Sequence, residues 1–148
     1  SQNALGIRYF RGEGVEKNYQ EAVKWYRLSA ENNYSWGQYN LGYMYDNGNG
    51  VVEDNKEAVK WYELAAKRGN STAQFRLANQ YREGSGVKKD DVYAYMWLKI
   101  SSNKGYKKAT EILNELNDAL TFQEIQLANM LSDTCKESKY KKCSLEDF

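Results

Sequence analysis

The chain has 148 residues and a net charge of +1, from 21 Lys and Arg against 20 Asp and Glu. This balance gives no field that would attract nucleic acid or anionic lipid, and no apolar run is long enough to insert into a membrane. The chain has no His, the commonest general base and metal ligand, and no Pro.

The sequence repeats itself with a period of 36 residues. Three Trp lie in register at this spacing: Trp25, Trp61 and Trp97. Each copy also carries a Gly-x-Gly-Val segment, which ends at Val15, Val51 and Val87. A phosphate-binding glycine loop is needed once per site, whereas a turn is needed once per repeat. The three copies therefore favour a turn, and the fixed period predicts an array of structural repeats.

Each repeat is predicted to form two helices, A and then B, on either side of the glycine turn. The expected helices lie near residues 1–11, 19–32, 35–47, 54–68, 71–83, 90–104, 107–119 and 122–137. Residues 1–120 hold about three and a half repeats, and residues 121–148 form a C-terminal capping helix and tail. A terminal repeat departs from the pattern because it covers an otherwise exposed apolar face.

Polar residues before each helix are the predicted caps. Ser35 and Ser71 are expected to cap the second and third A helices, with Gln38 and Gln74 three residues on, as in a capping box. The other expected caps are Asn18, Asp54, Asp90 and Thr121. Ser1 falls at the repeat position of Gly37 and Ala73, so we expect the first A helix to begin without its cap.

Small residues recur where two helices would approach each other. Gly6, Gly42 and Ala78 share one position, and we expect Trp and Tyr rings to fill the space beside them. The repeated Trp25, Trp61 and Trp97 belong to the expected core. Trp36 has no Trp at the equivalent positions and is expected on the surface.

This pattern resembles a known repeat family. Leu-Gly-x-x-Tyr followed by Ala-x-x-x-aromatic, as in Leu41-Gly42…Tyr45 with Ala58…Tyr62, is the skeleton of the tetratricopeptide repeat. The 36-residue length, the Gly-x-Gly-Val turn and the Ala-x-x-Trp-Tyr of helix B more closely resemble the Sel-one-like repeat (SLR), a relative. The resemblance covers residues 1 to about 143.

The resemblance implies an all-α fold, a right-handed superhelical solenoid of antiparallel helix pairs. It also implies a non-catalytic adaptor that binds a protein or peptide partner. Members of the family are commonly bacterial and often exported, so a periplasmic or secreted location is favoured over the cytoplasm.

Cys135 and Cys143 are the only cysteines. On one straight helix their Cα atoms would lie about 12 Å apart, too far for a disulfide, so a bridge requires the helix to end between them. The spacing alone leaves two free thiols as an alternative. The resemblance to cysteine-rich SLR proteins implies a Cys135–Cys143 bridge and an oxidising compartment.

Little in the sequence suggests catalysis. Asp90 and Asp91 are the only two adjacent aspartates, and they fall at a cap position. Cys135 lacks a His for a Cys-His pair. Two cysteines without His do not supply the four ligands of a zinc site. We therefore expect no enzyme activity, no cofactor and no metal.

The resemblance also implies where a partner binds, because helix A lines the concave groove of tetratricopeptide arrays. The corresponding residues here are Ile7, Phe10, Arg11, Trp36, Tyr39, Tyr43, Asp46, Phe75, Asn79, Arg82 and Glu111. Asn3 takes the position that Tyr39 and Phe75 hold in the later repeats. Exposed aromatic residues among mixed charges are typical of a protein-binding surface.

Three alternatives remain open at this point. Tyr39 and Phe75 could serve only to pack adjacent A helices. The chain could be a structural segment of a longer solenoid, with its binding face elsewhere. The aromatic residues could also stack on sugars and form a carbohydrate-binding surface.

Overall fold

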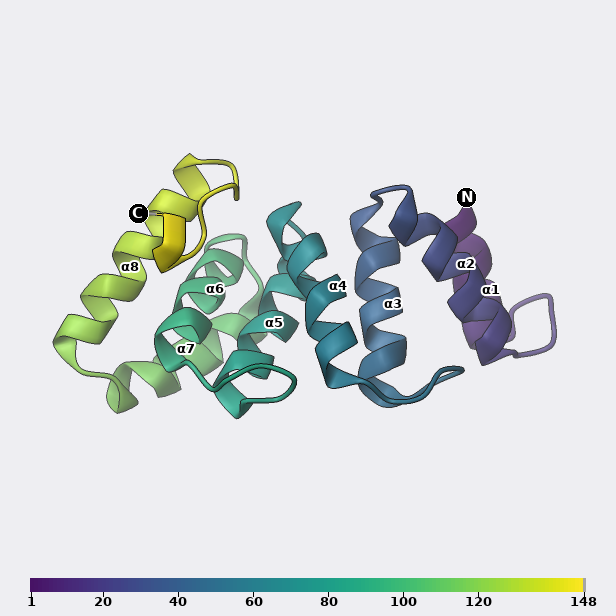
Figure 1. Cartoon of the computed structure of the whole chain (residues 1–148), viewed down its shortest axis with the longest axis horizontal. Coiled ribbons are helices and arrows are strands. Elements are labelled where there is room, and N and C mark those ends of the chain that lie inside the picture. Colours follow the sequence, from purple (N-terminus) through teal and green to yellow (C-terminus); the bar gives the residue numbers. More distant parts are fainter. Residues whose placement is uncertain (148) are drawn as a thin grey trace. The chain divides into compact units, whose positions relative to one another are not determined.

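The computed structural model describes residues 1–147, which form eight α-helices, one short 3-10 helix and no strand (Figure 1). The helices are α1 (Gln2–Arg11), α2 (Tyr19–Glu31), α3 (Ser35–Asn47), α4 (Asn55–Lys67), α5 (Ser71–Glu83), α6 (Asp91–Asn103), α7 (Lys107–Ala119) and α8 (Phe122–Glu137), followed by η1 (Leu145–Asp147). Each predicted helix is present, with its ends within one residue of the expected positions. The chain divides into two compact units, Ser1–Ala65 and the part that begins at Ala66.

Most of the predicted caps are confirmed. Side-chain oxygens of Asn18, Asp54 and Asp90 accept hydrogen bonds from backbone N–H groups in the first turns of α2, α4 and α6. Thr121 and Glu124 form a complete capping box at the start of α8. These bonds satisfy N–H groups that have no partner within the helix.

The predicted caps of α3 and α5 are wrong. The N-cap residues are Tyr34, which makes no side-chain cap bond, and Asn70, whose side chain accepts from the N–H of Ala73. Ser35 and Ser71 are instead the first residues of their helices.

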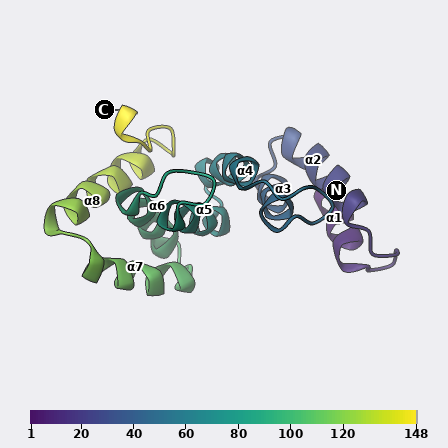
Figure 2. The ribbon, with the colours of Figure 1, turned by 60° about the horizontal axis from the view of Figure 1, so that its bottom comes forward.

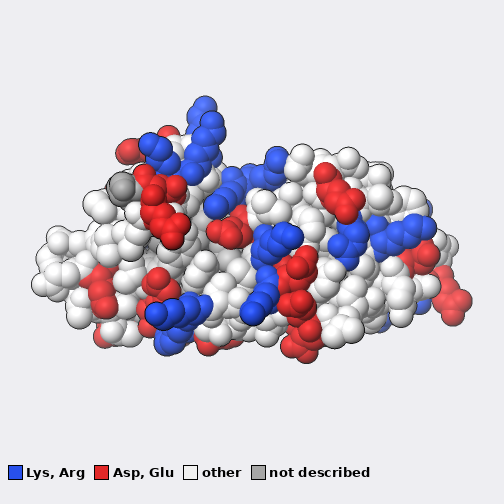
Figure 3. Space-filling model, in the orientation of Figure 1, with Lys and Arg blue, Asp and Glu red and all other residues white. Residues whose placement is uncertain are grey.

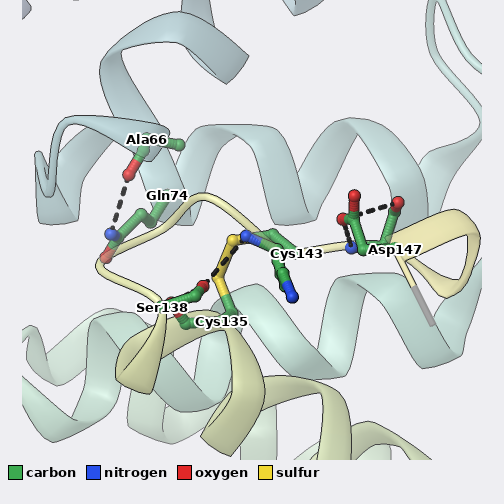
Figure 4. Close-up of a disulfide and its surroundings, with 8 residues drawn as sticks. Ala66, Gln74, Cys135, Ser138, Cys143 and Asp147 are labelled. Atoms are coloured by element: carbon green, nitrogen blue, oxygen red, sulfur yellow. Dashed lines mark hydrogen bonds between the residues drawn. A yellow bond between two sulfur atoms is a disulfide. The ribbon is translucent and has the colours of Figure 1, made fainter.

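The two glutamines of the expected capping boxes are buried and serve a different purpose. Gln38 donates to the carbonyl oxygen of Ala30 at 3.4 Å, and Gln74 donates to that of Ala66 at 3.0 Å (Figure 4). Ala30 and Ala66 lie in the last turns of α2 and α4, where carbonyl groups lack helical partners. Each glutamine therefore ties an A helix to the end of the preceding B helix.

The cap expected to be missing from α1 is present. Ser1 is the N-cap residue, and its Oγ accepts a hydrogen bond from the N–H of Ala4 at 3.2 Å.

The glycine turns have the predicted left-handed backbone. Gly48 and Gly50 have φ angles of 65° and 73°. A Cβ on Gly50 would meet the carbonyl carbon of Tyr19 at 2.6 Å. Glycine is therefore favoured at position 50 for two reasons: the backbone has a left-handed conformation, and the turn packs closely on the backbone at the start of α2.

In the first unit, each A helix packs on its B helix at a glycine. A Cβ on Gly6 would lie 2.6 Å from the Tyr26 ring, and one on Gly42 would lie 2.9 Å from the Tyr62 ring. Both tyrosines are buried. In the second unit, Ala78 and Leu98 hold the equivalent positions and are fully buried. Where alanine replaces the glycine, leucine thus replaces the tyrosine ring.

The expectation that all three repeated Trp lie in the core is only partly correct. Trp97 is fully buried, whereas Trp25 and Trp61 are partly buried. The reason is that α6 contacts α8 as well as α5 and α7 (Figure 2). Ile100 on α6 is likewise fully buried, whereas its equivalents Leu28 and Leu64 are exposed.

The chain after α8 turns back on itself. Lys139 and Tyr140 adopt positive φ angles, and the Cα atoms of Cys135 and Cys143 lie 4.4 Å apart, joined by the disulfide (Figure 4). The bridge implied by the resemblance is therefore present, and both cysteines are buried. The hydroxyl of Ser138 closes the same loop, donating to the Cys135 carbonyl and accepting from the N–H of Lys142.

The contact between Gly42 and Tyr62 generates a stability prediction. Gly42→Ala should destabilise the protein by about 1–3 kcal/mol, because the new methyl group overlaps the ring. The same change should cost less in a Tyr62→Leu background, since that pair reproduces Ala78 and Leu98. Urea unfolding of the four proteins of this cycle measures the difference. An equal cost in both backgrounds would show that the ring does not require the glycine.

The disulfide generates a second prediction. Replacing Cys135 and Cys143 with Ser should raise amide hydrogen exchange after Ser138 and in the last turn of α8. Because the closed loop is short, we expect a cost below the 2–5 kcal/mol typical of disulfides in small secreted domains. Exchange in α1, α2 and α3 should not change, because repeats are stabilised by their neighbours. Faster exchange throughout the chain would contradict this local role.

Candidate partner-binding groove

A groove of about 420 Å³ lies in the first unit, between α1 and α3. Six of the predicted partner-binding residues line it: Ile7, Phe10, Arg11, Trp36, Tyr39 and Tyr43. The other lining residues are Asn3, Tyr26, Tyr34, Asn40 and Met44. Sequence reasoning placed Asn3 on this face but did not identify the last four.

Four aromatic rings form a continuous series along the groove. On α3, Trp36 meets Tyr39 edge-on with ring centroids 5.7 Å apart, and Tyr39 lies 6.4 Å from Tyr43. Tyr43 then meets the edge of Phe10 of α1 at 6.1 Å. Spacings of three and four residues place the three rings of α3 on one helical face. Such contacts restrict the rings, so the surface is largely preformed.

The groove exists because an aromatic ring is missing from the first repeat. In the second repeat, the Tyr39 ring covers Tyr62 at 5.7 Å, and in the third, the Phe75 ring packs on Tyr106 at 5.0 Å. Asn3 holds their position in α1. Its side chain is shorter and accepts a hydrogen bond from Asn40 at 2.9 Å. The space that a ring fills in the later repeats is left open here.

Tyr26 forms the floor of this space. It is 3% exposed, and burial raises its pKa from 10.0 to about 12, although the nearby Arg11 guanidinium opposes the shift. The hydroxyl therefore keeps its proton at physiological pH. Tyr62, its equivalent in the second repeat, donates to Asp46 Oδ2 at 3.1 Å. Phe10 replaces Asp46 in the first repeat, and within residues 1–147 the Tyr26 hydroxyl has no hydrogen-bond partner.

The remaining predicted residues lie outside this groove. Asp46 accepts from Tyr62, and Phe75 is only 7% exposed beneath Tyr106, which favours its packing role. Arg82 pairs with Glu115 at 3.5 Å, and Asn79 is partly buried. Glu111 is exposed on α7. In the second unit, therefore, the predicted residues do not line this groove.

The groove residues that were missed fall into two groups. Tyr26 and Met44 are buried residues of the core, and they line the groove because Asn3 does not cover them. Tyr34 and Asn40 lie just before and within α3. The sequence signal that could have identified them is Asn3, which stands where the later repeats have an aromatic residue. The residues around that position would then be expected to line an open space.

The two adjacent aspartates of the sequence have structural partners. Asp90 caps α6, and Asp91 pairs with Lys89 at 2.7 Å. No cluster of three or more His, Cys, Asp or Glu that could hold a metal ion is found among residues 1–147. On the face shown in Figure 3, basic and acidic side chains are interspersed. None of the described helices has the length and hydrophobicity needed to cross a membrane.

Comparison with known proteins gives a consistent result. A family model described as the Sel1 repeat matches residues 1–34, 37–70 and 71–106. None of the curated proteins matches the sequence.

Two solved structures are similar to the chain. One is c5321, a protective antigen present in uropathogenic Escherichia coli strains that displays an SLR fold. It is 41% identical over 73% of this chain and 23% of its own, with a TM-score of 0.72. The other is a Sel1 repeat protein from Oxalobacter formigenes, 39% identical over 77% of this chain and 86% of its own, with a TM-score of 0.71. Together with the eight helices, these likenesses show an all-α solenoid fold.

The environment of Tyr26 generates a prediction about alkaline pH. Because its pKa is raised in the folded state, the unfolded chain loses the phenol proton more readily. The resulting stabilisation is complete below pH 10 and is lost as the pH rises towards 12. Between these values, the unfolding free energy of the unmodified protein should fall more steeply than that of Tyr26→Phe. Tyr95, whose pKa burial also raises, is present in both proteins and cancels. Equal slopes in urea unfolding would contradict a buried neutral Tyr26.

Proposed function

The chain belongs to the Sel1 repeat family of protein-interaction scaffolds, and we propose that it binds a peptide segment of a protein partner in the groove between α1 and α3. The family is generally non-enzymatic, which agrees with a role in recognition rather than catalysis. The single observation that carries the proposal is the run of rings from Trp36 to Phe10, part of it open to solvent.

The exposure of the groove rim supports this proposal. Tyr34 and Trp36 are 49% and 43% exposed, although large aromatic side chains are normally buried. Tyr and Trp are enriched among the residues that dominate binding energy, because they bury large areas with few rotatable bonds. The rings lie beside the amides of Asn3 and Asn40, which can satisfy polar groups of a peptide backbone. A groove with apolar walls and a few polar groups suits a peptide better than a flat surface does.

We also propose that the protein works in an oxidising compartment. The Cys135–Cys143 disulfide supports this proposal, since such bonds persist in secreted and periplasmic proteins and are rare in the cytosol. A periplasmic or secreted protein, commonly of a bacterium, is the setting that agrees best with this chemistry.

The binding proposal generates a prediction for variants of the groove. Peptides selected from a random displayed library against the purified protein should lose about tenfold or more in affinity on Trp36→Ala or Tyr39→Ala, as expected for a central binding residue. Phe122→Ala is the matched control, because this aromatic residue is 70% exposed on α8 and outside the groove. Isothermal titration calorimetry measures the affinities.

The Phe122→Ala control distinguishes binding in the groove from nonspecific binding to exposed aromatic residues. Equal losses in all three variants would indicate unspecific aromatic contacts. No effect of the groove variants would place the binding face elsewhere, as in a purely structural segment of a longer solenoid. Binding to a glycan array in place of peptides would favour the carbohydrate alternative.

A further inference from the structure

We propose that the groove is specific for a peptide segment that carries an Asp or Glu side chain together with an aromatic side chain. The carboxylate would accept hydrogen bonds from the Tyr26 hydroxyl and the Arg11 guanidinium, and the aromatic ring would occupy the space above Asn3. This inference rests on the proposed function of the groove and names the chemistry of its ligand.

The chain itself contains the model for the carboxylate contact. In the second repeat, the Tyr62 hydroxyl donates to the side-chain carboxylate of Asp46 at 3.1 Å. In the first repeat, Phe10 takes the place of Asp46, and the Tyr26 hydroxyl has no hydrogen-bond partner within the described residues. The ring of Tyr26 is buried, but its hydroxyl is not among the enclosed polar atoms that lack a hydrogen-bond partner, so a ligand in the groove can reach it. A carboxylate from a ligand would give Tyr26 the hydrogen bond that Asp46 gives Tyr62 in the second repeat.

The charge of the groove favours the same ligand. Arg11 is the only charged residue among those that line it, and no carboxylate is present. Arg11 lies near enough to Tyr26 to oppose the rise of its pKa. Its contact with Glu13 is a long 3.7 Å pair between exposed side chains, which holds it weakly. The phenol and the guanidinium are therefore two donors available to one anionic group.

The aromatic part of the ligand follows from the missing ring. Tyr39 and Phe75 fill the position of Asn3 in the later repeats and pack on Tyr62 and Tyr106. Their partners in the first repeat, Tyr26 and Tyr34, line the groove instead. A ligand ring placed above Asn3 would recover these two contacts. It would also meet Trp36 and Tyr39 on the wall formed by α3.

The acidic group is assigned to a side chain, because the internal model is the side chain of Asp46. A random library fused to its display protein at the C-terminal end tests this source, since its members have no free C-terminal carboxylate. We expect the selected peptides to be enriched in an acidic residue with an aromatic residue nearby. Binding found only with a second library, whose C-termini are free, would overturn the side-chain assignment.

Four variants test the individual contacts with the selected peptides. Tyr26→Phe and Arg11→Gln should each weaken binding about tenfold, the value of a charge-assisted hydrogen bond. Their matched controls are Tyr62→Phe, which removes the equivalent hydroxyl, and Arg8→Gln, which removes an exposed charge of α1 outside the groove. Both controls should leave the affinity unchanged. Circular dichroism melts confirm that each variant is folded.

A fifth variant fills the groove. Asn3→Phe supplies the ring that Phe75 provides in the third repeat, so it should abolish peptide binding without lowering the melting temperature. Replacing the acidic residue of the peptide by its amide should reduce affinity for the unmodified protein and have little effect on the Arg11→Gln variant. This double comparison isolates the pairing between the carboxylate and Arg11.

The outcomes separate the two proposals. If Trp36→Ala and Asn3→Phe abolish binding but Tyr26→Phe and Arg11→Gln do not, the groove binds peptides and the acidic specificity is wrong. If no peptide is selected, or if Trp36→Ala has no effect, the proposed function fails. A dimer in sedimentation that Asn3→Phe dissociates would make a second copy of the chain the occupant, and would overturn the inference.

Discussion

The close approach of paired helices is the constraint on which the repeats of the first unit depend. Gly6 and Gly42 have no side chain, so the Tyr26 and Tyr62 rings lie against the helix backbone, where even a methyl group would overlap. A glycine in mid-helix costs about 0.5–1 kcal/mol relative to alanine, and ring burial offsets it. The contact also fixes where each tyrosine hydroxyl points. The packing of the repeat thereby positions a polar group beside the groove.

The proposed binding function depends on departures from the repeat pattern. The fold tolerates Asn3 in place of an aromatic residue and Phe10 in place of Asp46, because the glycine–tyrosine contact is kept. The first change opens space, and the second leaves the Tyr26 hydroxyl without a partner. Two substitutions of opposite polarity thus convert a packed junction into a groove with an aromatic wall and two hydrogen-bond donors.

The helices could be predicted closely because the turns are marked by glycines and the B helices by Asn18, Asp54 and Asp90. The caps of α3 and α5 could not be predicted. Gln38 and Gln74 have the spacing of capping-box residues in the sequence, but in the structure they form hydrogen bonds with the end of the preceding helix. Register predicted the chemical type of the groove residues but not their exposure. Tyr39 and Phe75 share one repeat position, yet Phe75 is buried because Tyr106 covers it, and Asn70, which has no ring, holds the repeat position of Tyr106 one repeat earlier.

In the second unit, α8 covers a face of α6 whose equivalent on α2 is exposed in the first unit. Leu28 and Leu64 are 36% and 41% exposed, but Ile100 at the same repeat position is fully buried on α6, which α8 contacts. The disulfide from Cys135 to Cys143 joins the last turn of α8 to the segment that follows it. Phe75 and Trp97 of this unit are buried and are used for packing, whereas Tyr34 and Trp36 at the rim of the groove in the first unit are exposed.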